Sequence, residues 1–304
     1  FGEAVINATG VFTDDILKME NPNARNMVKP SQGVHLVFDK SFLPGEDAIM
    51  IPKTEDGRVL FAVPWHDKVI VGTTDTQLDE HSLEPSALEK EIEFILETFN
   101  NYLEKKVTRA DVRSIYAGLR PLAAPKDGSE KSKEISRSHK ILVSETGLIT
   151  ITGGKWTTFR RMAQDTVNKA ISLGKLPKKE CKTADLKIHG AKENPDLSNH
   201  LYIYGSDQPE IQNLINEDSS LGEKLHPRLD FLKAEVVFAA RHELARTVDD
   251  VLARRVRMLF MDAKAAIESA PEVAALLAKE LEKDEAWKEK QVADFKEIAK
   301  HYTI

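Results

Sequence analysis

The 304-residue chain contains a single cysteine, Cys181, and no apolar run near the roughly 20 residues that span a bilayer. One cysteine cannot form an intrachain disulfide or supply a multi-cysteine zinc or iron–sulfur site. The sequence does not open with the pattern of a signal peptide, which is a positively charged stretch followed by an apolar one. We therefore expect a cytoplasmic protein, with peripheral attachment to the inner face of the plasma membrane as an open alternative.

The chain also lacks an excess of positive charge. It has 43 Lys and Arg and 49 Asp and Glu, which give a net charge of −6. A general nucleic-acid binder needs a positive surface to displace the counterions of phosphate, so nucleic acid is not an expected partner. Hydrophobic residues make up 41% of the chain and charged residues 30%, a balance typical of globular proteins. The length predicts two or three domains.

The first part of the chain has the pattern of an α/β unit followed by a sheet. Residues 4–6 form an apolar strand, and a turn at Gly10 leads into a helix. Short β-branched runs separated by Pro, Gly and Asp fill residues 28–76, which predicts a mostly antiparallel sheet. Ser86 and Glu89 have capping-box spacing, so we expect an amphipathic helix to begin there and cover one face of this sheet.

The middle and the end of the chain differ in pattern. Residues 112–122 predict another strand, residues 124–134 an exposed polar loop, and residues 140–152 a hairpin. Residues 201–204, LYIY, predict one more short strand. Beyond them apolar residues recur at helical spacing, which predicts a separate helical domain of about 100 residues.

The segment GLITITGGKWTTFRRMAQDTVNKAI, residues 147–171, runs from a strand through two glycines into a helix. Gly153 and Gly154 let a ligand approach the backbone, and the free N–H groups of a helix start attract partly negative atoms. Lys155 adds a full charge, while the hydroxyls of residues 157–158 cap the helix or donate to a ligand. An ordinary glycine turn with solvated charges accounts for the same pattern equally well.

Beyond this turn, Arg160 and Arg161 are expected to point away from an apolar stripe. The stripe that we expect to be buried consists of Phe159, Met162, Ala163, Thr166, Val167 and Ala170. Gly10 marks a second strand-to-helix turn of the same kind. Because ligands of open α/β sheets bind at the carboxyl ends of strands, two such turns on one sheet can line a nucleotide-like cofactor.

Three further side chains are candidates for binding an anionic substrate or moving a proton. Arg120 ends an apolar strand, and Arg137 precedes the hairpin; a guanidinium binds phosphate through paired hydrogen bonds. Each arginine has an ion pair with an acidic side chain as its alternative reading. His35 follows a turn and suits a general base, although a core histidine with satisfied hydrogen bonds gives the same pattern.

The sequence gives no support for a metal site. The string HELAR at His242 has the His-Glu pair of a zinc helix, but Arg246 occupies the position of the second histidine. No arrangement of Ser, His and Asp stands out for nucleophilic catalysis either. We therefore expect no bound metal.

Taken together, seven strings resemble the FAD-dependent, quinone-linked glycerol-3-phosphate dehydrogenases, as their C-terminal portion. They are INATGVFTDDI, KPSQGVHLVF, VPWHDKVIVGTTDT, YAGLRPL, ISRSHKI, GLITITGGKWTTFRRMAQDTV and AEVVFAARHELARTVDDVLARR, which cover nearly the whole chain in the family's order. The resemblance implies α/β plus α architecture. A D-amino-acid-oxidase-type fold, with an incomplete FAD domain interwoven with an antiparallel-sheet substrate domain, precedes a helical C-terminal domain.

The resemblance also implies a reaction and a set of binding residues. The family transfers a hydride from C2 of sn-glycerol 3-phosphate to flavin N5, forms dihydroxyacetone phosphate, and passes electrons to the quinone pool. By resemblance, Arg120 and Arg137 bind the substrate phosphate or orient the substrate. His35 lies near the C2 hydroxyl as the candidate proton acceptor.

The cofactor residues are implied in the same way. Lys155 and the helix start at Trp156, Thr157 and Thr158 face flavin N1 and the C2 carbonyl, where negative charge grows on reduction. Gly153 and Gly154 permit close approach, and Gly10 lies along the phosphate-bearing portion of FAD. The catalytic set is thus His35, Lys155 and Arg120.

One departure from the family pattern concerns the pyrophosphate of FAD. The family begins with a strand and a Gly-x-Gly-x-x-Gly turn, and this chain contains no such turn. We therefore expect FAD in the full-length protein and weak or no FAD binding by the 304-residue chain, which we expect to be inactive alone. Membrane-surface association and a homodimer are further candidate interactions.

The resemblance predicts a division by residue range. Residues 1–27 and 140–178 are the remainder of the FAD domain, residues 28–139 the substrate-binding sheet domain, and residues 184–304 the helical domain. Two alternatives stay open for function. One is a glycerol-3-phosphate oxidase that hands electrons to oxygen, and the other is a non-catalytic anion-binding or interaction module.

Overall fold

The structure is a computed structural model that describes residues 2–52, 54, 57–123 and 139–304. The polar loop expected at residues 124–134 and the candidate Arg137 lie outside these residues. The chain divides into two compact units, each built from three stretches. The first unit comprises residues 1–33, 75–85 and 118–186, and the second comprises residues 34–74, 86–117 and 187–304.

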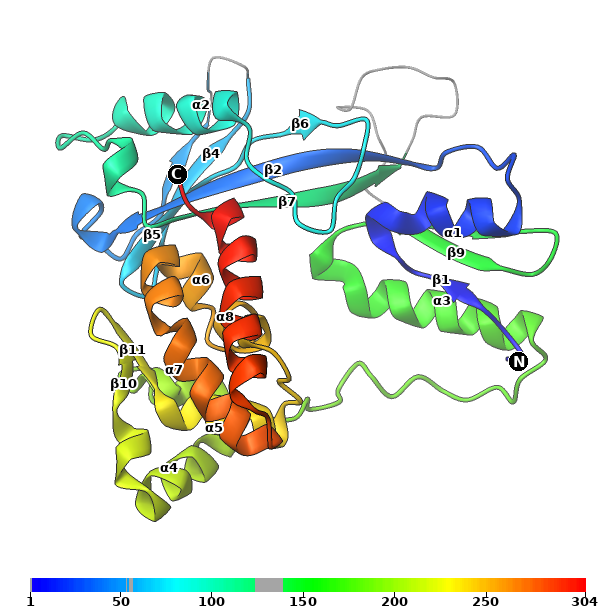
Figure 1. The fold of residues 1–304 in the computed structure, drawn as a ribbon. Coiled ribbons are helices and arrows are strands. Elements are labelled where there is room, and N and C mark those ends of the chain that lie inside the picture. The colour runs from blue at the N-terminus through cyan, green and yellow to red at the C-terminus, as the bar shows by residue number, and fades with distance from the viewer. Residues whose placement is uncertain (1, 53, 55–56, 124–138) are drawn as a thin grey trace. The chain divides into compact units, whose positions relative to one another are not determined.

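The first unit contains a three-stranded sheet with helices α1 and α3 (Figure 1). Its elements are β1 (Ile6–Asn7), η1 (Gly10–Phe12), α1 (Thr13–Glu20), β8 (His139–Val143), β9 (Ile149–Gly153), η5 (Trp156–Thr158) and α3 (Phe159–Leu173). β9 lies in the middle, parallel to β1 and antiparallel to β8. This confirms the hairpin expected at residues 140–152.

Asp14 connects α1 to the strand that follows. Its two carboxylate oxygens accept backbone hydrogen bonds from Met27 N at 2.8 Å and Val28 N at 3.1 Å. The side chain is 7% exposed, so its charge is stabilised by these donors in place of water. A residue in the first turn of α1 thereby fixes where β2 begins.

A six-stranded sheet follows, with the order β3-β4-β5-β2-β6 and β7 paired to β2. Its strands are β2 (Val28–Asp39), β3 (Ile49–Ile51), β4 (Leu60–Trp65), β5 (Lys68–Gly72), β6 (Thr76–Gln77) and β7 (Ser114–Ala123). The pairs β2–β5, β2–β6, β3–β4 and β4–β5 are all antiparallel, which confirms the expectation for residues 28–76. β2 and β7 each run from one unit into the other.

Helix α2 (Glu89–Asn100) covers one face of this sheet, as expected. Ile92, Ile95 and Phe99 are buried in one apolar cluster with Val34 and Leu36 of β2. The burial of such side chains contributes about 1.5–3 kcal/mol each.

The expected cap at Ser86 and Glu89 was wrong by two residues, because the helix starts after Leu88. Glu91 Oε2 accepts from Leu88 N at 2.9 Å, and its Oε1 accepts from the Thr74 hydroxyl at 2.8 Å. Glu91 is only 2% exposed, so these two hydrogen bonds compensate for the buried charge. The hydroxyl of Ser86 instead contacts His301.

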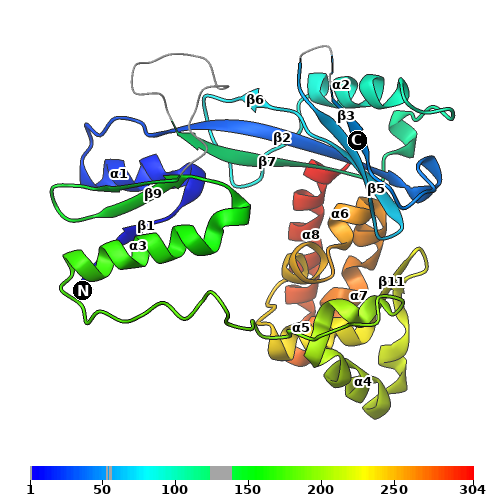
Figure 2. The ribbon, with the colours of Figure 1, turned by 180° about the vertical axis from the view of Figure 1, so that it is seen from behind.

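The C-terminal part of the second unit is mainly helical (Figures 1 and 2). Its elements are η6 (His200–Asp207), α4 (Gln208–Glu217), η7 (Ser219–Gly222), β10 (Lys224–His226), β11 (Leu229–Leu232), α5 (Lys233–His242), a π-helical turn η8 (Asp250–Arg255), α6 (Met258–Met261), α7 (Ala263–Leu281), α8 (Glu285–Ala299) and η9 (Lys300–Tyr302). Short 3₁₀ turns elsewhere are η2 (Lys40–Phe42) and η3 (Arg109–Asp111). α7 and α8 pack side by side.

The strand expected at residues 201–204 was wrong, since this string lies inside the 3₁₀ turn η6. Leu201 and Tyr204 point into a core with α4 and α5, and the Tyr204 hydroxyl donates to Glu235 at 2.8 Å. Glu235 is fully buried, so burial and this carboxylate raise the pKa of Tyr204. The small hairpin β10–β11 was not expected.

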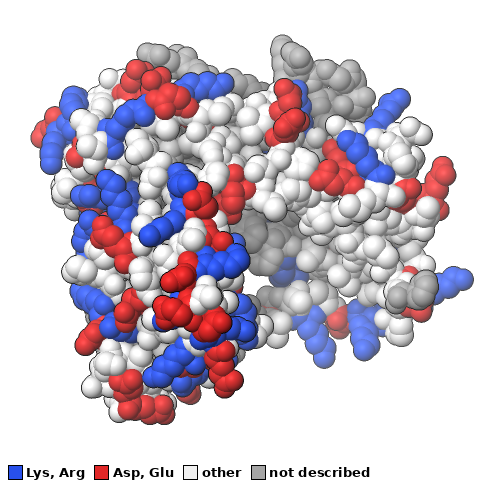
Figure 3. All heavy atoms as spheres, viewed as in Figure 1, with Lys and Arg blue, Asp and Glu red and all other residues white. Residues whose placement is uncertain are grey.

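Charged side chains of both signs alternate over the helical part on the face shown in Figure 3. Many of them form ion pairs, such as Arg241 with Glu280 at 2.6 Å and Lys233 with Glu272 at 2.9 Å. In both pairs one partner is well exposed and the other largely covered, and pairs at a protein surface contribute about 0–1 kcal/mol each. Among the residues described above, no helix is both long enough and apolar enough to cross a membrane.

Hydrogen bonds join the start of β7 to α6 and α7 within the second unit. Arg113 O accepts from Ala263 N at 2.9 Å, and the Ser114 hydroxyl donates to Leu259 O at 2.7 Å. Asp262, 2% exposed, caps α7 through Ala265 N at 2.9 Å and pairs with Arg228 at 3.2 Å. These bonds explain why α6 and α7 lie against this strand.

Candidate functional site

The turn after β9 has the backbone that its two glycines permit. Gly153 and Gly154 have φ values of 73° and 81°, a region that residues with a Cβ rarely adopt. A Cβ on Gly154 would lie 2.6 Å from Met162 Sδ and 3.2 Å from His139 Cβ. Both conformation and space therefore require glycine at residue 154.

The charged and hydroxyl residues after this turn lie at the surface. Lys155 and the three residues of η5 are exposed. The Thr158 hydroxyl donates to Lys155 O at 2.9 Å, so it closes the turn and does not cap α3. α3 has no acidic residue in its first turn, which leaves the positive end of its dipole uncompensated there.

The two arginines that follow are engaged with their neighbours. Arg160 Nη1 donates to Gln164 Oε1 at 2.9 Å and to Thr183 Oγ1 at 3.1 Å. Arg161 Nε lies 3.0 Å from Asp165 Oδ1. Both side chains are thus held by local contacts, in agreement with their expected direction.

The second turn, after β1, is fixed by a buried amide. Asn7, 1% exposed, donates from Nδ2 to Thr13 O at 3.0 Å and accepts from the Thr9 hydroxyl at 2.7 Å. Gly10 follows with φ of 63°. Because β1 and β9 are parallel neighbours, with Asn7 opposite Thr150, both glycine turns leave the same edge of the sheet.

A cavity of about 400 Å³ lies at this edge, and Gly10 and Gly153 both line it. The other lining residues are mostly apolar: Ile6, Ala8, Pro121, Ile151, Thr152, Phe159, Met162, Ala163, Thr166 and Val167. The structure therefore brings together two of the seven expected cofactor residues around one hollow. Residues 154–158 are not part of its lining.

The expected burial of the α3 stripe was largely wrong. Thr166 and Ala170 are buried, but Phe159 is 58% exposed and Val167 is 49% exposed. Phe159 and Val167 border the cavity, so no described side chain covers them as core packing would. Helical periodicity identified the apolar face correctly, whereas burial depends on what lies opposite that face.

Arg120 lies on β7 beside an acidic residue that the sequence reasoning missed. Its Nη1 is 3.6 Å from Asp75 Oδ1, and the Ser31 hydroxyl donates to the same oxygen of Asp75. All three residues belong to the first unit. The acidic partner named above as the alternative for this arginine is therefore present. The available signal was an acidic residue in the short connection between β5 and β6.

His35 lies on β2 in the second unit, opposite Gly72 of β5. Its ring is stacked on Tyr116 of β7 with ring centroids 5.1 Å apart. Tyr116 in turn contacts Phe260, and Phe260 contacts Tyr302, both edge to face. Burial raises the pKa of Tyr116 to about 12, so this phenol stays neutral at physiological pH. Neither Tyr116 nor Gly72 was singled out from the sequence.

The chain matches two described protein families. Residues 1–160, more than half of the chain, match the family described as FAD dependent oxidoreductase. Residues 144–288 match the C-terminal domain of alpha-glycerophosphate oxidase. The chain therefore belongs to the FAD-dependent oxidoreductase family, and the expected flavoprotein fold with a helical C-terminal domain is confirmed.

Individual relatives agree with the family that the sequence motifs resemble. The chain is 38% identical to the mitochondrial glycerol-3-phosphate dehydrogenase of Arabidopsis thaliana, over 98% of this chain and 52% of that protein. It is 36% identical to the human mitochondrial glycerol-3-phosphate dehydrogenase, over 95% of this chain and 42% of that protein. The chain thus spans about half the length of the curated relatives it matches.

A solved structure has a similar fold. The glycerol-3-phosphate dehydrogenase from Bacillus halodurans, complexed with FAD, superimposes with a TM-score of 0.81. The two share 26% sequence identity, and the match covers 99% of this chain and 62% of that one.

Proposed function

We propose that the full-length protein oxidises sn-glycerol 3-phosphate to dihydroxyacetone phosphate with FAD and passes the electrons to quinone. One observation carries this proposal: two glycine turns leave the same edge of a parallel strand pair and line one cavity. The chain that contains them belongs to an FAD-dependent family and is similar to proteins named glycerol-3-phosphate dehydrogenase.

The residues present fit one part of FAD. Gly10 and Gly153 have positive φ values that let a cofactor approach the backbone, and Lys155 is exposed beside a helix start without acidic residues. We propose that Gly154 and Trp156, Thr157 and Thr158 complete this wall, with Lys155 placing a positive charge near N1 and the C2 carbonyl of the ring. Bound FAD would supply the acceptor for the hydride that leaves C2 of the substrate.

The side chains of this chain then bind the substrate and accept its proton. Arg120, with Arg137, binds the phosphate through charge-assisted hydrogen bonds. His35 accepts the proton of the C2 hydroxyl as the C–H bond at C2 breaks. The proton thus goes to the imidazole and the hydride to the cofactor, and the C2 carbon becomes the carbonyl of the product. Stacking on Tyr116 supports this role because it restrains the imidazole ring.

The remaining assignments also form part of the proposal. Residues 1–27 and 140–178 serve the cofactor, residues 28–139 the substrate, and residues 184–304 form the helical domain. We place the protein in the cytoplasm as a peripheral protein of the inner face of the plasma membrane, where quinone is accessible, and as a homodimer. The matched relatives from Arabidopsis thaliana and human are named as mitochondrial proteins.

The test uses purified full-length protein and reduction of a soluble quinone analogue that depends on sn-glycerol 3-phosphate. Arg120→Ala should lower kcat/KM by about 10- to 100-fold, the loss expected for hydrogen bonds to a charged group. Arg109→Ala is the matched control, because Arg109 lies at the surface and pairs with Glu89. Substrate-independent or absent reduction by the wild-type protein would support the non-catalytic alternative.

Oxygen is the second candidate acceptor, since residues 144–288 match the C-terminal domain of alpha-glycerophosphate oxidase. Stopped-flow reoxidation of the reduced full-length protein compares oxygen with a quinone analogue directly. Faster reoxidation by oxygen would assign the oxidase reaction and leave the proposed substrate unchanged.

A further inference from the structure

A second cavity, of about 290 Å³, lies entirely within the second unit. Its lining comes from the turn between β4 and β5, from His189 and Gly190, from η6, from Phe231 and Glu243, and from the chain between Arg254 and Met261. None of the residues proposed above for FAD or substrate contributes to its lining. Its occupant is therefore a question separate from the oxidation reaction.

Two basic side chains at this cavity come from backbone positions that side chains rarely occupy. His66 has φ of 51° and Arg257 has φ of 57°, both in the left-handed region. Such conformations persist in non-glycine residues when the surroundings over-determine them, and they cluster at ligand sites. Both side chains are exposed at the rim of the cavity.

The charge balance around the cavity leaves Arg257 as the cation without a counter-charge. Arg254 pairs with Asp249, Arg255 lies 3.4 Å from Glu243, and His189 lies 2.6 Å from Asp207. The guanidinium of Arg257 makes no hydrogen bond or ion pair with any residue in the described part of the chain. Although the His66 side chain is exposed at the rim, partial desolvation of its ring, followed by the charge of Arg257, lowers the pKa of His66.

The inner wall of the cavity is apolar. It is formed by Trp65, Ile203, Phe231, Val256 and Met261. Val256 and Met261 are buried, and the half-buried Trp65 packs against the helical core, so its indole ring is held in place. A flat apolar group stacks favourably on such a ring.

We propose that this cavity binds a small carboxylate with an aromatic body, with the carboxylate on Arg257 and His66 and the ring against Trp65. A single unpaired guanidinium matches the charge and fork geometry of one carboxylate. The volume admits a ligand of one or two fused rings and excludes a dinucleotide.

The test is isothermal titration of the full chain with 2-naphthoate, and with 2-naphthalenemethanol as the uncharged analogue. Naphthoate should bind at least roughly tenfold more tightly than the alcohol, the factor expected from a charge-assisted hydrogen bond. Trp65→Ala should weaken both ligands to a similar extent. Equal affinity for naphthoate and the alcohol, or no binding of either, overturns the proposal.

Arg257→Gly separates ligand binding from stability. Glycine adopts the left-handed backbone freely, so this variant should keep its melting temperature while naphthoate affinity falls by roughly tenfold or more. Arg109→Ala, which removes a cation outside the cavity, should leave naphthoate affinity unchanged. An unchanged affinity in Arg257→Gly, or an equal loss in Arg109→Ala, contradicts the assignment.

Discussion

The imidazole ring of His35 and the phenol ring of Tyr116 lie nearly parallel, with 5.1 Å between centroids and 16° between ring planes. This stack joins β2 to β7 and sets the orientation of the histidine proposed to accept the substrate proton. Tyr116 is itself held by an edge-to-face contact with Phe260 at 5.2 Å. The position of the side chain that we propose as proton acceptor thus depends on aromatic packing that extends into the helical part.

The Tyr116 ring, and not its hydroxyl, should matter for activity of the full-length protein. Tyr116→Phe keeps the stack and should change kcat by less than about twofold, because the phenol is already neutral at physiological pH. Tyr116→Leu removes an aromatic pair worth about 0.5–1.5 kcal/mol, so kcat should fall by about 2- to 10-fold. Steady-state kinetics with both variants checks this. A comparable loss in Tyr116→Phe would assign the role to the hydroxyl.

Gly72 should be sensitive to the addition of a single methyl group. A Cβ at this position would lie 2.3 Å from His35 Cδ2 and 2.8 Å from Val34 O. We expect Gly72→Ala to lower the free energy of unfolding by about 1–3 kcal/mol through overpacking, and to displace the imidazole. Urea denaturation measures this loss. Gly118→Ala is the matched control, since a Cβ there meets no atom within 4 Å and the change should be nearly neutral.

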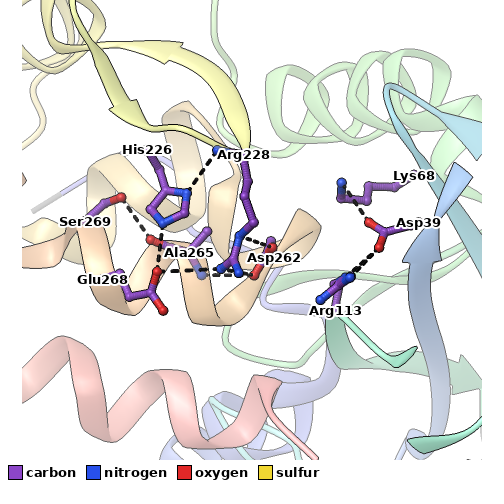
Figure 4. Close-up of polar contacts among 9 residues, drawn as sticks. All are labelled: Asp39, Lys68, Arg113, His226, Arg228, Asp262, Ala265, Glu268 and Ser269. Atoms are coloured by element: carbon purple, nitrogen blue, oxygen red, sulfur yellow. Dashed lines mark hydrogen bonds and ion pairs between the residues drawn. The ribbon is translucent and has the colours of Figure 1, made fainter. Parts of the chain in front are cut away.

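The ion cluster of Asp39, Arg113 and Lys68 should make stability depend on pH in the acid range (Figure 4). Burial raises the pKa of Asp39, but the hydrogen bond from Arg113 and the charge of Lys68 outweigh it and hold this pKa below 3.8. A carboxyl whose pKa is lower in the folded state than in the unfolded state stabilises the fold fully above pH 3.8, its unfolded pKa. This stabilisation is lost as the pH falls through the pKa of the folded state.

Asp39→Asn tests this contribution. At about pH 6 it should lower the free energy of unfolding by about 2–4 kcal/mol, because it leaves Lys68, whose side chain is 7% exposed, without its carboxylate. The difference from wild type should shrink at about pH 3. Asp294→Asn, at a surface pair with Lys290, should change stability by less than about 0.5 kcal/mol. A pH-independent effect of Asp39→Asn would rule out the linkage.

The 304-residue chain should purify with much less than one FAD per chain. It provides the glycine turns at residues 10 and 153–154 but no Gly-x-Gly-x-x-Gly sequence to hold the pyrophosphate. The ratio of flavin absorbance to protein absorbance measures this, with the full-length protein as the comparison. Stoichiometric flavin in the shorter chain would show that the present residues suffice.

Features set by local sequence were predicted well. The hairpin of β8 and β9, the antiparallel sheet and the apolar face of α2 follow from turn residues and periodicity, which neighbouring residues determine. The start of α2 was not predicted correctly. The residue that caps it, Glu91, is held in place by a hydrogen bond from Thr74, which is distant in the sequence. Residues 201–204 have strand propensity, but core packing with α4 and α5 favours a 3₁₀ turn.

The candidate site was predictable in part for the same reason. Gly10 and Gly153 could be found because positive φ requires glycine, and they line one cavity. Asp75 beside Arg120, and Tyr116 beside His35, are partners that lie far apart in the sequence. The exposure of Phe159 on α3 likewise depends on three-dimensional surroundings that periodicity does not report.

The passage of β2 and β7 through both units has a consequence for cooperativity. β2 changes units between Gly33 and Val34, and β7 between Ala117 and Gly118, each within a continuous strand. A single cleavage of the chain therefore cannot separate either unit intact. Unfolding of one unit also disrupts part of β2 and β7, strands that the other unit contains as well. The described parts of the chain should unfold in one calorimetric transition, because at residues 33–34 and 117–118 the chain passes between the units within a strand and not through a linker.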